Sequence, residues 1–335
     1  MTSNIYMHKW EVIREYGESL DNSNDLSGEF MHYTSIDTAF NILDSDSFWA
    51  TNVRFSNDAM EERLLKIDNI IDRDDYVVCF CTKNDKLSQW RGYCHDGGMA
   101  INLDLNFTQE YSVLHADYET TGNYIIYENT PLPVLYMNHG FEQETVKRRL
   151  EVVIEKLKYD SEIRAEDMLP YLKNGHFNEE QEARLVFTNE KSNLSKCIRF
   201  RTLNDGVKVP YMVIKYGNMG KMKGKCPTDI TEFTDDKFKE IAKSGDTVWI
   251  EEGYDQESKY FEMAKRLARF KKNNPRQQNL RILCKGKLPV VGITVAPTYD
   301  RERKAEQIRR FCQSKYWLRN VKVSISDIPF VKPNL

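Results

Sequence analysis

The apolar residues of this chain occur in many short runs separated by polar turns, and this feature most restricts the folds open to it. Tyr76 to Cys81 is a continuous apolar run, which is typical of a strand buried on both faces. Ala100 to Leu105 alternates between apolar and polar residues, as a half-buried strand does. Segments 142–157, 260–270 and 301–317 instead have the pattern of helices. This mixture predicts an α+β fold with mixed β-sheets and flanking helices.

The other expected elements follow the same patterns. Ser35 is placed to cap a helix in which Ile36, Phe40 and Leu43 recur at helical spacing. Further helices are expected over 10–16 and 61–71, with a helical turn over 87–93. Further strands are expected over 30–34, 48–51, 113–118, 134–137, 184–188, 211–216, 247–250, 288–295 and 321–325.

Composition points to a globular protein that carries more charge than average. Hydrophobic residues make up 40% and charged residues 30% of the 335 residues. No run approaches the roughly 18 apolar residues that cross a bilayer, and the first ten residues have no secretory apolar core. We therefore expect a cytoplasmic protein with no membrane partner. The expected division is a polar segment 1–28, a core domain 29–220 and a basic portion 221–335 packed on that core.

The seven cysteines include one close pair, Cys79 and Cys81. On a strand, both of these thiols point to the same face. A structural zinc site usually takes two such pairs, with two to four residues between the members of each. We therefore expect reduced thiols and no metal ion.

Charge is unevenly distributed along the chain. Residues 1–85 carry 17 Asp/Glu and 7 Lys/Arg, a balance of −10, whereas residues 257–320 carry 5 Asp/Glu and 17 Lys/Arg, a balance of +12. A basic face of this kind can bind nucleic acid or a nucleotide polyphosphate. The structural alternative is that these cations are solvated and pair with the acidic N-terminal third.

Two motifs place ligand-binding groups on expected strands. His32, beside Tyr33 and Thr34, comes just before a helix start, and its ring can hydrogen-bond a ribose hydroxyl. Glu182 and Arg184 point to the same face of an extended segment. The carboxylate can accept a hydrogen bond from a sugar hydroxyl while the guanidinium binds a phosphate. Alternatively, they pair with each other at the surface, which is worth at most about 1 kcal/mol.

Two further segments carry polar groups at turns. Asn57 or Asp58 is a natural helix cap with Glu61 in the first turn, while Arg54 is placed to meet a phosphate. Further along, Trp90 and Tyr93 share one face of a helical turn. Tyr93, beside Arg91 and the Gly97-Gly98 turn, can stack a planar ring.

Taken in order, these motifs resemble a large bacterial family catalogued as a domain of unknown function. They read His-Tyr-Thr from 32, Phe-x-Asn-Asp-x-x-Glu from 55, Trp-x-x-Tyr from 90, Gly-x-x-Ile-x-Leu from 98 and Glu-x-Arg from 182. The segments 290–297 and 324–329 also match that family's usual ending. The resemblance covers roughly residues 30–330, and the family is in turn distantly similar to ADP-ribosyltransferases.

The resemblance implies an enzyme that consumes NAD as its substrate. It also implies a core in which two small split sheets bind the dinucleotide between them. His32 would hold a ribose hydroxyl, and Tyr93, or alternatively Tyr33, would stack on nicotinamide. Glu182 would stabilise the positive charge that develops as the glycosidic bond breaks. These side chains should line one cleft. The other implied cofactor contacts are Thr34, Arg54, Arg91 and Arg184.

The biological role implied is a toxin or phage-defence effector that modifies a macromolecule, either protein or nucleic acid. A second hypothesis is a non-catalytic module that binds nucleic acid or a nucleotide through residues 257–320. A third is a metal-dependent hydrolase built on His32, Asp58, Glu61 and His95, which is least favoured because the chain has no compact His-x-x-x-His pair.

Overall fold

The structure is a computed structural model of the full chain. It describes residues 3–18, 29–55, 73–94, 97–105, 109–137, 143–157, 163–190, 193–203, 206–219, 233–244, 248–250, 256–277, 280–284 and 286–329. The expected helix over 61–71, with Asn57, Asp58 and Glu61, lies outside these residues, as does His95.

The chain forms two compact units, each built from separated segments. The first unit comprises residues 1–32, 47–88 and 105–214, and the second comprises residues 33–46, 89–104 and 215–335. The second unit thus takes two segments from within the region 29–220.

The first unit contains a sheet with the strand order β1-β3-β2-β12-β5-β6. β10 pairs antiparallel with β3 over its whole length, from Glu182 opposite Cys81 to Glu190 opposite Arg73. It also pairs with the short strand β7. The strand bounds are β1 Glu29–Ser35, β2 Phe48–Asn52, β3 Arg73–Cys81, β5 Gln109–Leu114, β6 Tyr124–Asn129, β7 Leu132–Pro133, β10 Glu182–Glu190, β11 Arg199–Thr202 and β12 Lys208–Tyr216.

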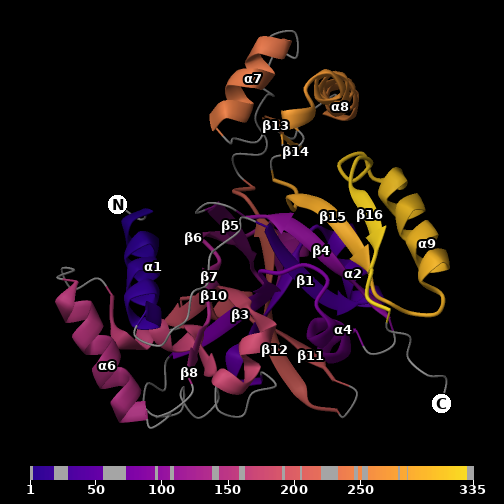
Figure 1. Ribbon diagram of the computed structural model, residues 1–335. Helices are drawn as coiled ribbons and strands as arrows, with labels where there is room; N and C mark the ends of the chain where they lie inside the picture. The colour runs from indigo at the N-terminus through magenta and orange to yellow at the C-terminus, as the bar shows by residue number, and fades with distance from the viewer. Residues whose placement is uncertain are drawn as a thin grey trace. The chain divides into compact units, whose positions relative to one another are not determined.

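Helices pack on the first unit's core through apolar stripes. In α1 (Ser3–Glu18) the buried residues Val12, Ile13 and Tyr16 recur at helical spacing. They share one apolar cluster with α6 (Gln143–Lys156), the 3-10 helix η2 (Ala165–Tyr171) and the centres of β3 and β10. Figure 1 shows α1 and α6 side by side. This unit also contains α5 (Tyr118–Thr121) and the parallel pair β8 (Leu135–Met137) and β9 (Leu172–Asn174).

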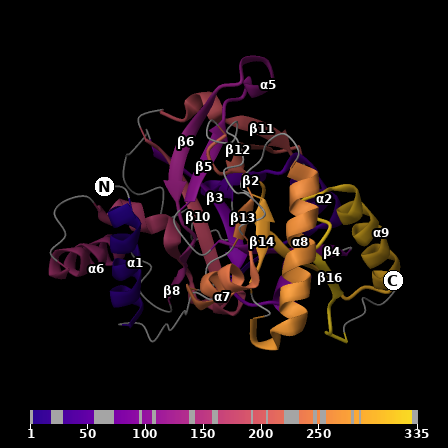
Figure 2. The same cartoon turned by 90° about the horizontal axis from the view of Figure 1, so that it is seen from above.

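The second unit has a smaller mixed set of strands. β15 (Val290–Val295) pairs antiparallel with β4 (Gly98–Asp104) and parallel with β16 (Lys322–Ile325). α9 (Arg301–Ser314) packs on β15 and β16 (Figure 1). Figure 2 shows α8 (Gln256–Asn273) beside β14 (Ile282–Cys284), which pairs with β13 (Val248–Ile250). The remaining helices are α2 (Ile36–Ser45), α4 (Leu87–Tyr93), which begins in the first unit, and α7 (Asp235–Ser244).

The α+β class is confirmed, and most expected elements are present near their expected bounds. Ser35 caps α2 as expected, its hydroxyl accepting a hydrogen bond from the Thr38 backbone. The strand expected over 113–118 is wrong at its end: β5 stops at Leu114, and a turn follows in which Thr121 donates to Asp117. The finer expectation of an ADP-ribosyltransferase-like pair of split sheets stays a prediction. No described helix has both the length and the apolar character that crossing a membrane requires.

Gly98 permits a close backbone approach within the second unit. A Cβ atom there would lie 2.2 Å from the Thr34 carbonyl oxygen and 2.7 Å from the Cys94 sulfur. We expect Gly98→Ala to lower the free energy of unfolding by about 1–3 kcal/mol, because backbone must move to admit the methyl group. Urea unfolding measures this change.

Gly92 provides the matched control for that substitution. It lies in α4, and a Cβ atom at this position meets nothing within 4 Å. Gly92→Ala should therefore leave stability unchanged or raise it by up to about 1 kcal/mol. Equal effects of the two substitutions would show that the close approach at Gly98 is unimportant.

Candidate functional site

Glu182 and Arg184 form a buried ion pair at the start of β10. Their side chains are 6% and 2% exposed, and the Arg184 Nε donates to a Glu182 oxygen at 2.6 Å. The guanidinium also donates to the backbone carbonyl of Pro170 in η2, at 2.7 Å. The alternative that these two side chains pair with each other is therefore confirmed, but its expected place at the surface is wrong, because both groups are shielded from water.

Lys173 adds a second cation to this pair. Its ammonium lies 2.8 Å from a Glu182 oxygen and 2.6 Å from Glu180. Burial alone raises the pKa of the Glu182 carboxyl, but Arg184 and Lys173 outweigh burial and lower that pKa to about 2. Glu182 is therefore ionised at neutral pH, with its negative charge held by two neighbouring cations.

Cys79 contacts the same carboxylate from β3. Its side chain is exposed, yet the surrounding protein and the Glu182 charge raise the pKa of the thiol well above its usual range. The thiol therefore stays protonated at neutral pH. Cys81, two residues on, is buried. A thiol held in this form is a poor nucleophile and a poor metal ligand.

His32 lies on β1 in an aromatic environment. Its Nδ1 donates to the Cys79 carbonyl oxygen at 2.9 Å. Its ring makes edge contacts with Phe48 and Phe80 at centroid distances of 5.9 and 6.0 Å. Burial lowers the pKa of this imidazole despite the hydrogen bond. His32 is thus a neutral ring whose Nδ1 proton is donated to the Cys79 carbonyl oxygen.

The strand register decides whether His32 and Glu182 can share a site. Met31 and Glu182 both pair with Cys81, so all three side chains point to one face of the sheet. His32 follows Met31 and points to the other face, where it contacts Phe80. The transferase hypothesis needs His32 and Glu182 in one cleft, and their opposite faces contradict that requirement.

Four further residues that the resemblance places against NAD belong to the second unit: Tyr33, Thr34, Arg91 and Tyr93. Tyr33 is 6% exposed and packs edge-on against Trp90, with a centroid distance of 4.7 Å. Tyr93 is 38% exposed, and Arg91 is exposed beside it on α4. The Thr34 carbonyl oxygen accepts a hydrogen bond from Cys94. The expectation that either tyrosine stacks on nicotinamide stays a prediction, although burial of Tyr33 leaves little ring surface for it.

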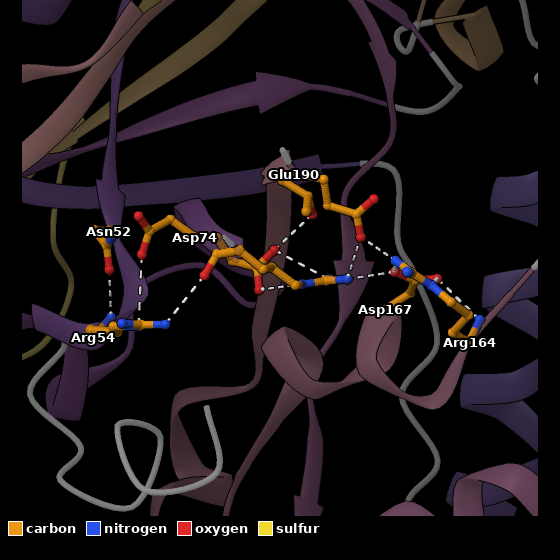
Figure 3. Close-up of polar contacts among 9 residues, drawn as sticks. Asn52, Arg54, Asp74, Arg164, Asp167 and Glu190 are labelled. Atoms are coloured by element: carbon orange, nitrogen blue, oxygen red, sulfur yellow. Dashed lines mark hydrogen bonds and ion pairs between the residues drawn. The ribbon is translucent and has the colours of Figure 1, made fainter. Parts of the chain in front are cut away.

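Arg54 takes part in a second charged network at the opposite end of β3 and β10 (Figure 3). Its guanidinium is 3.7 Å from Asp74 and donates to the Arg73 carbonyl at 3.2 Å. The contact to Asp74 is only partly buried, with both side chains 38% exposed. Arg54 therefore has protein partners, and its expected contact with a phosphate stays a prediction.

Arg73 is the centre of that network. Its guanidinium, 8% exposed, lies 3.2 Å from Asp75, 2.7 Å from Asp167 and 3.2 Å from Glu190. Arg164 reaches Asp167 and Glu190 from the other side (Figure 3). Burial raises the pKa of Asp167, but hydrogen bonds from Arg164 and Arg73 lower it to about 2. The network joins η2 to β3 and β10, and in it two guanidinium groups, Arg73 and Arg164, lie among three carboxylates.

The metal hypothesis has no support in the part of the chain that the structure describes. Within it, no group of three or more His, Cys, Asp or Glu side chains is placed to hold an ion. Of the four ligands proposed, only His32 lies in that part, and its Nδ1 is bound to the Cys79 carbonyl.

The exposed face of α8 carries a row of cations, which we call the α8 basic stripe: Lys265, Arg269, Lys272 and Arg276. The first three are spaced three or four residues apart on α8, and the fourth follows in the adjoining 3-10 turn. All four are exposed, and none of them pairs with a carboxylate among the described residues. The opposite side of the helix is buried through Tyr260, Met263, Leu267 and Phe270.

Several other cations of the second unit do pair with carboxylates. On α9, Arg309 and Arg310 both pair with Glu306, and Lys304 pairs with Asp300. Lys287 and Lys315 pair with acidic residues of the N-terminal third, Asp46 and Asp44. For Lys287 and Lys315, pairing with the acidic N-terminal third is therefore confirmed. The α8 basic stripe differs from these paired cations, because its members share one helix face and have no carboxylate partner among the described residues.

A sequence signal for this stripe was available beyond the net charge of 257–320. Residues 263–299 contain no Asp or Glu, and they carry Lys265, Arg266, Arg269, Lys271, Lys272, Arg276, Arg281, Lys285 and Lys287. An acid-free stretch of this length cannot balance its charge locally. Together with the helical spacing of its apolar residues, it locates the basic face on one side of α8.

Comparison of this chain with protein-family models, with curated proteins and with solved structures found no match in any of the three.

Proposed function

We propose that this protein binds nucleic acid without catalysis, through the α8 basic stripe. The observation that supports this most is that four exposed cations share one helix face and have no carboxylate partner among the described residues. Unpaired cations close together repel one another, so such a row is favourable mainly when an anionic polymer neutralises it.

The geometry of the stripe suits a phosphate backbone. Lys265 and Lys272 are seven residues apart on a helix, which corresponds to about 10 Å along its axis. Phosphates recur roughly every 3.4 Å along one strand of a duplex. The helical part of the stripe therefore spans about three phosphates, and Arg276 extends it further.

The transferase hypothesis is less well supported than this one. Glu182 is neutralised by Arg184 and Lys173, so little of its charge is available to a developing oxocarbenium ion. His32, its expected partner, points to the other face of the sheet. NAD as a substrate, and a modified acceptor, stay predictions.

The test is the salt dependence of binding to fluorescein-labelled 20-nucleotide DNA and RNA, measured by fluorescence anisotropy. The logarithm of the binding constant should fall with the logarithm of salt concentration, with a slope of about −3 to −4 if four phosphates are neutralised. The quadruple variant K265Q/R269Q/K272Q/R276Q should lose most of that slope, since each cation contributes about one unit.

A matched variant distinguishes binding at the α8 basic stripe from binding that depends only on the protein's total positive charge. R303Q/R309Q/R310Q/K322Q also removes four cations from the second unit, on α9 and β16. It should weaken binding less than about threefold at 100 mM salt, because it leaves the stripe intact. Equal losses from the two quadruple variants, or no salt-dependent binding by the unchanged protein, would rule out the proposal.

A further inference from the structure

Phe261 is the one aromatic side chain in the 259–277 part of α8 and its 3-10 turn that faces away from the core. It is 46% exposed, whereas Tyr260 and Phe270 on the same helix are 4% and 0% exposed. Because a phenylalanine has no polar atom to hydrate, this exposure leaves apolar ring surface in water. The core packing of α8 does not require an aromatic residue at this position.

Phe261 lies on the same face as the α8 basic stripe. It precedes Lys265 by four residues, one helical turn. The Lys265 ammonium sits 4.5 Å from the centre of its ring, which is a cation–π contact. The row therefore begins with a flat ring and continues with Lys265, Arg269, Lys272 and Arg276.

A flat ring beside phosphate-binding cations suits bases that are not already stacked. In a duplex both faces of each internal base are covered by its neighbours, so an aromatic side chain can stack only at ends, bulges or unpaired stretches. A single strand exposes base faces along its whole length, and every base offers one. The cations would hold the backbone while the ring takes one base.

We infer that the α8 surface prefers single-stranded nucleic acid, with Phe261 stacking on a base and the stripe neutralising the adjoining phosphates. This inference rests on the proposed function, because it assumes that the stripe binds phosphates. Stacking tolerates any base, so the expected ligand is a single strand of DNA or RNA without sequence preference.

The experiment compares three fluorescein-labelled probes of equal charge per strand: a 15-nucleotide oligothymidine, an abasic 15-mer with the same backbone, and a 15-base-pair duplex. The unchanged protein should bind oligothymidine about 5- to 100-fold more tightly than the abasic strand. Phe261→Ala should lose that advantage and bind both single strands alike. Phe261→Trp should keep it.

Tyr299→Ala is the matched control, because Tyr299 is also in the second unit and is 86% exposed. It should bind all three probes as the unchanged protein does. Position 261 is exposed, so its variants should fold normally, and their circular dichroism spectra check this. Melting temperatures should agree within a few degrees.

The outcomes separate this inference from the proposed function. If the quadruple stripe variant weakens binding but Phe261→Ala leaves the oligothymidine advantage unchanged, the proposed function holds and the stacking inference fails. If the unchanged protein binds the duplex as tightly as oligothymidine, the preference for single strands fails. If no probe binds, both fail.

Discussion

Replacing Arg184 with leucine should lower the free energy of unfolding by about 3–5 kcal/mol at pH 7. Arg184 is 2% exposed and supplies two hydrogen bonds to Glu182, at 2.6 and 3.1 Å. Its loss leaves a buried carboxylate with Lys173 as its remaining cation. It also leaves the Pro170 carbonyl without its donor. Urea unfolding followed by far-UV circular dichroism measures the change.

An exposed ion pair provides the control for Arg184→Leu. Arg310 and Glu306 are 77% and 54% exposed and lie 2.9 Å apart on α9. Arg310→Gln should cost less than about 0.5 kcal/mol, because exposed pairs four residues apart on a helix contribute little. A loss below 1 kcal/mol for Arg184→Leu would mean that water reaches the buried pair.

The same pair predicts a dependence on pH. The pKa of Glu182 is about 2 in the folded protein and 4.5 as an ordinary glutamate. A carboxyl whose pKa is lowered by folding adds stability above pH 4.5, and this contribution is lost as the pH falls from 4.5 towards 2. Arg184→Leu should therefore lose less stability than the unchanged protein does over that acid range.

The second large effect is expected at Arg73. Arg73→Met would leave the carboxylates of Asp75, Asp167 and Glu190 close together without their shared cation. Asp75 is 3% exposed, and burial already raises its pKa against the pull of Arg73. We expect a loss of about 3–5 kcal/mol at pH 7. The loss should shrink as the pH is lowered from 7, because a proton on Asp75, whose pKa burial raises, removes the buried negative charge that Arg73 had balanced.

Arg54→Met is the matched control, because Arg54 belongs to the network drawn in Figure 3 but is partly exposed. Its contact with Asp74 spans 3.7 Å, so the expected loss is below about 1 kcal/mol. If the two variants were equally stable at pH 7, the network would have to be water-filled, and the assigned role of Arg73 would fail.

The sequence predicted elements well where one short segment determines its own structure. Ser35 and the apolar spacing after it were sufficient to locate α2, and Tyr76 to Cys81 lies within β3. The α8 basic stripe could also be predicted from the sequence, since its apolar and basic positions alternate with the helical period. These signals are local, because neighbouring residues create them.

The relation between His32 and Glu182 could not be predicted in the same way. Each side chain's face depends on register across three strands that are distant in sequence, and a shift by one residue reverses it. Lys173, the second cation beside Glu182, comes from a different strand and gave no signal at all. Motif order alone therefore suggested a shared cleft that the pairing of β1 and β10 with β3 does not allow.

The interrupted course of the chain through its two units has a consequence for synthesis on the ribosome. Once residue 214 has emerged, every segment of the first unit is present, so that unit can fold early. Segments 33–46 and 89–104 lack part of their partners until residues 215–335 appear: β4 has no β15 to pair with, and Asp46 has no Leu288 amide to bind, 242 residues later. The apolar side chains Met99, Ile101 and Leu103 would meanwhile be open to misassociation. A nascent chain from which residues 1–214 have emerged, but later residues have not, should therefore expose these two segments to chaperones.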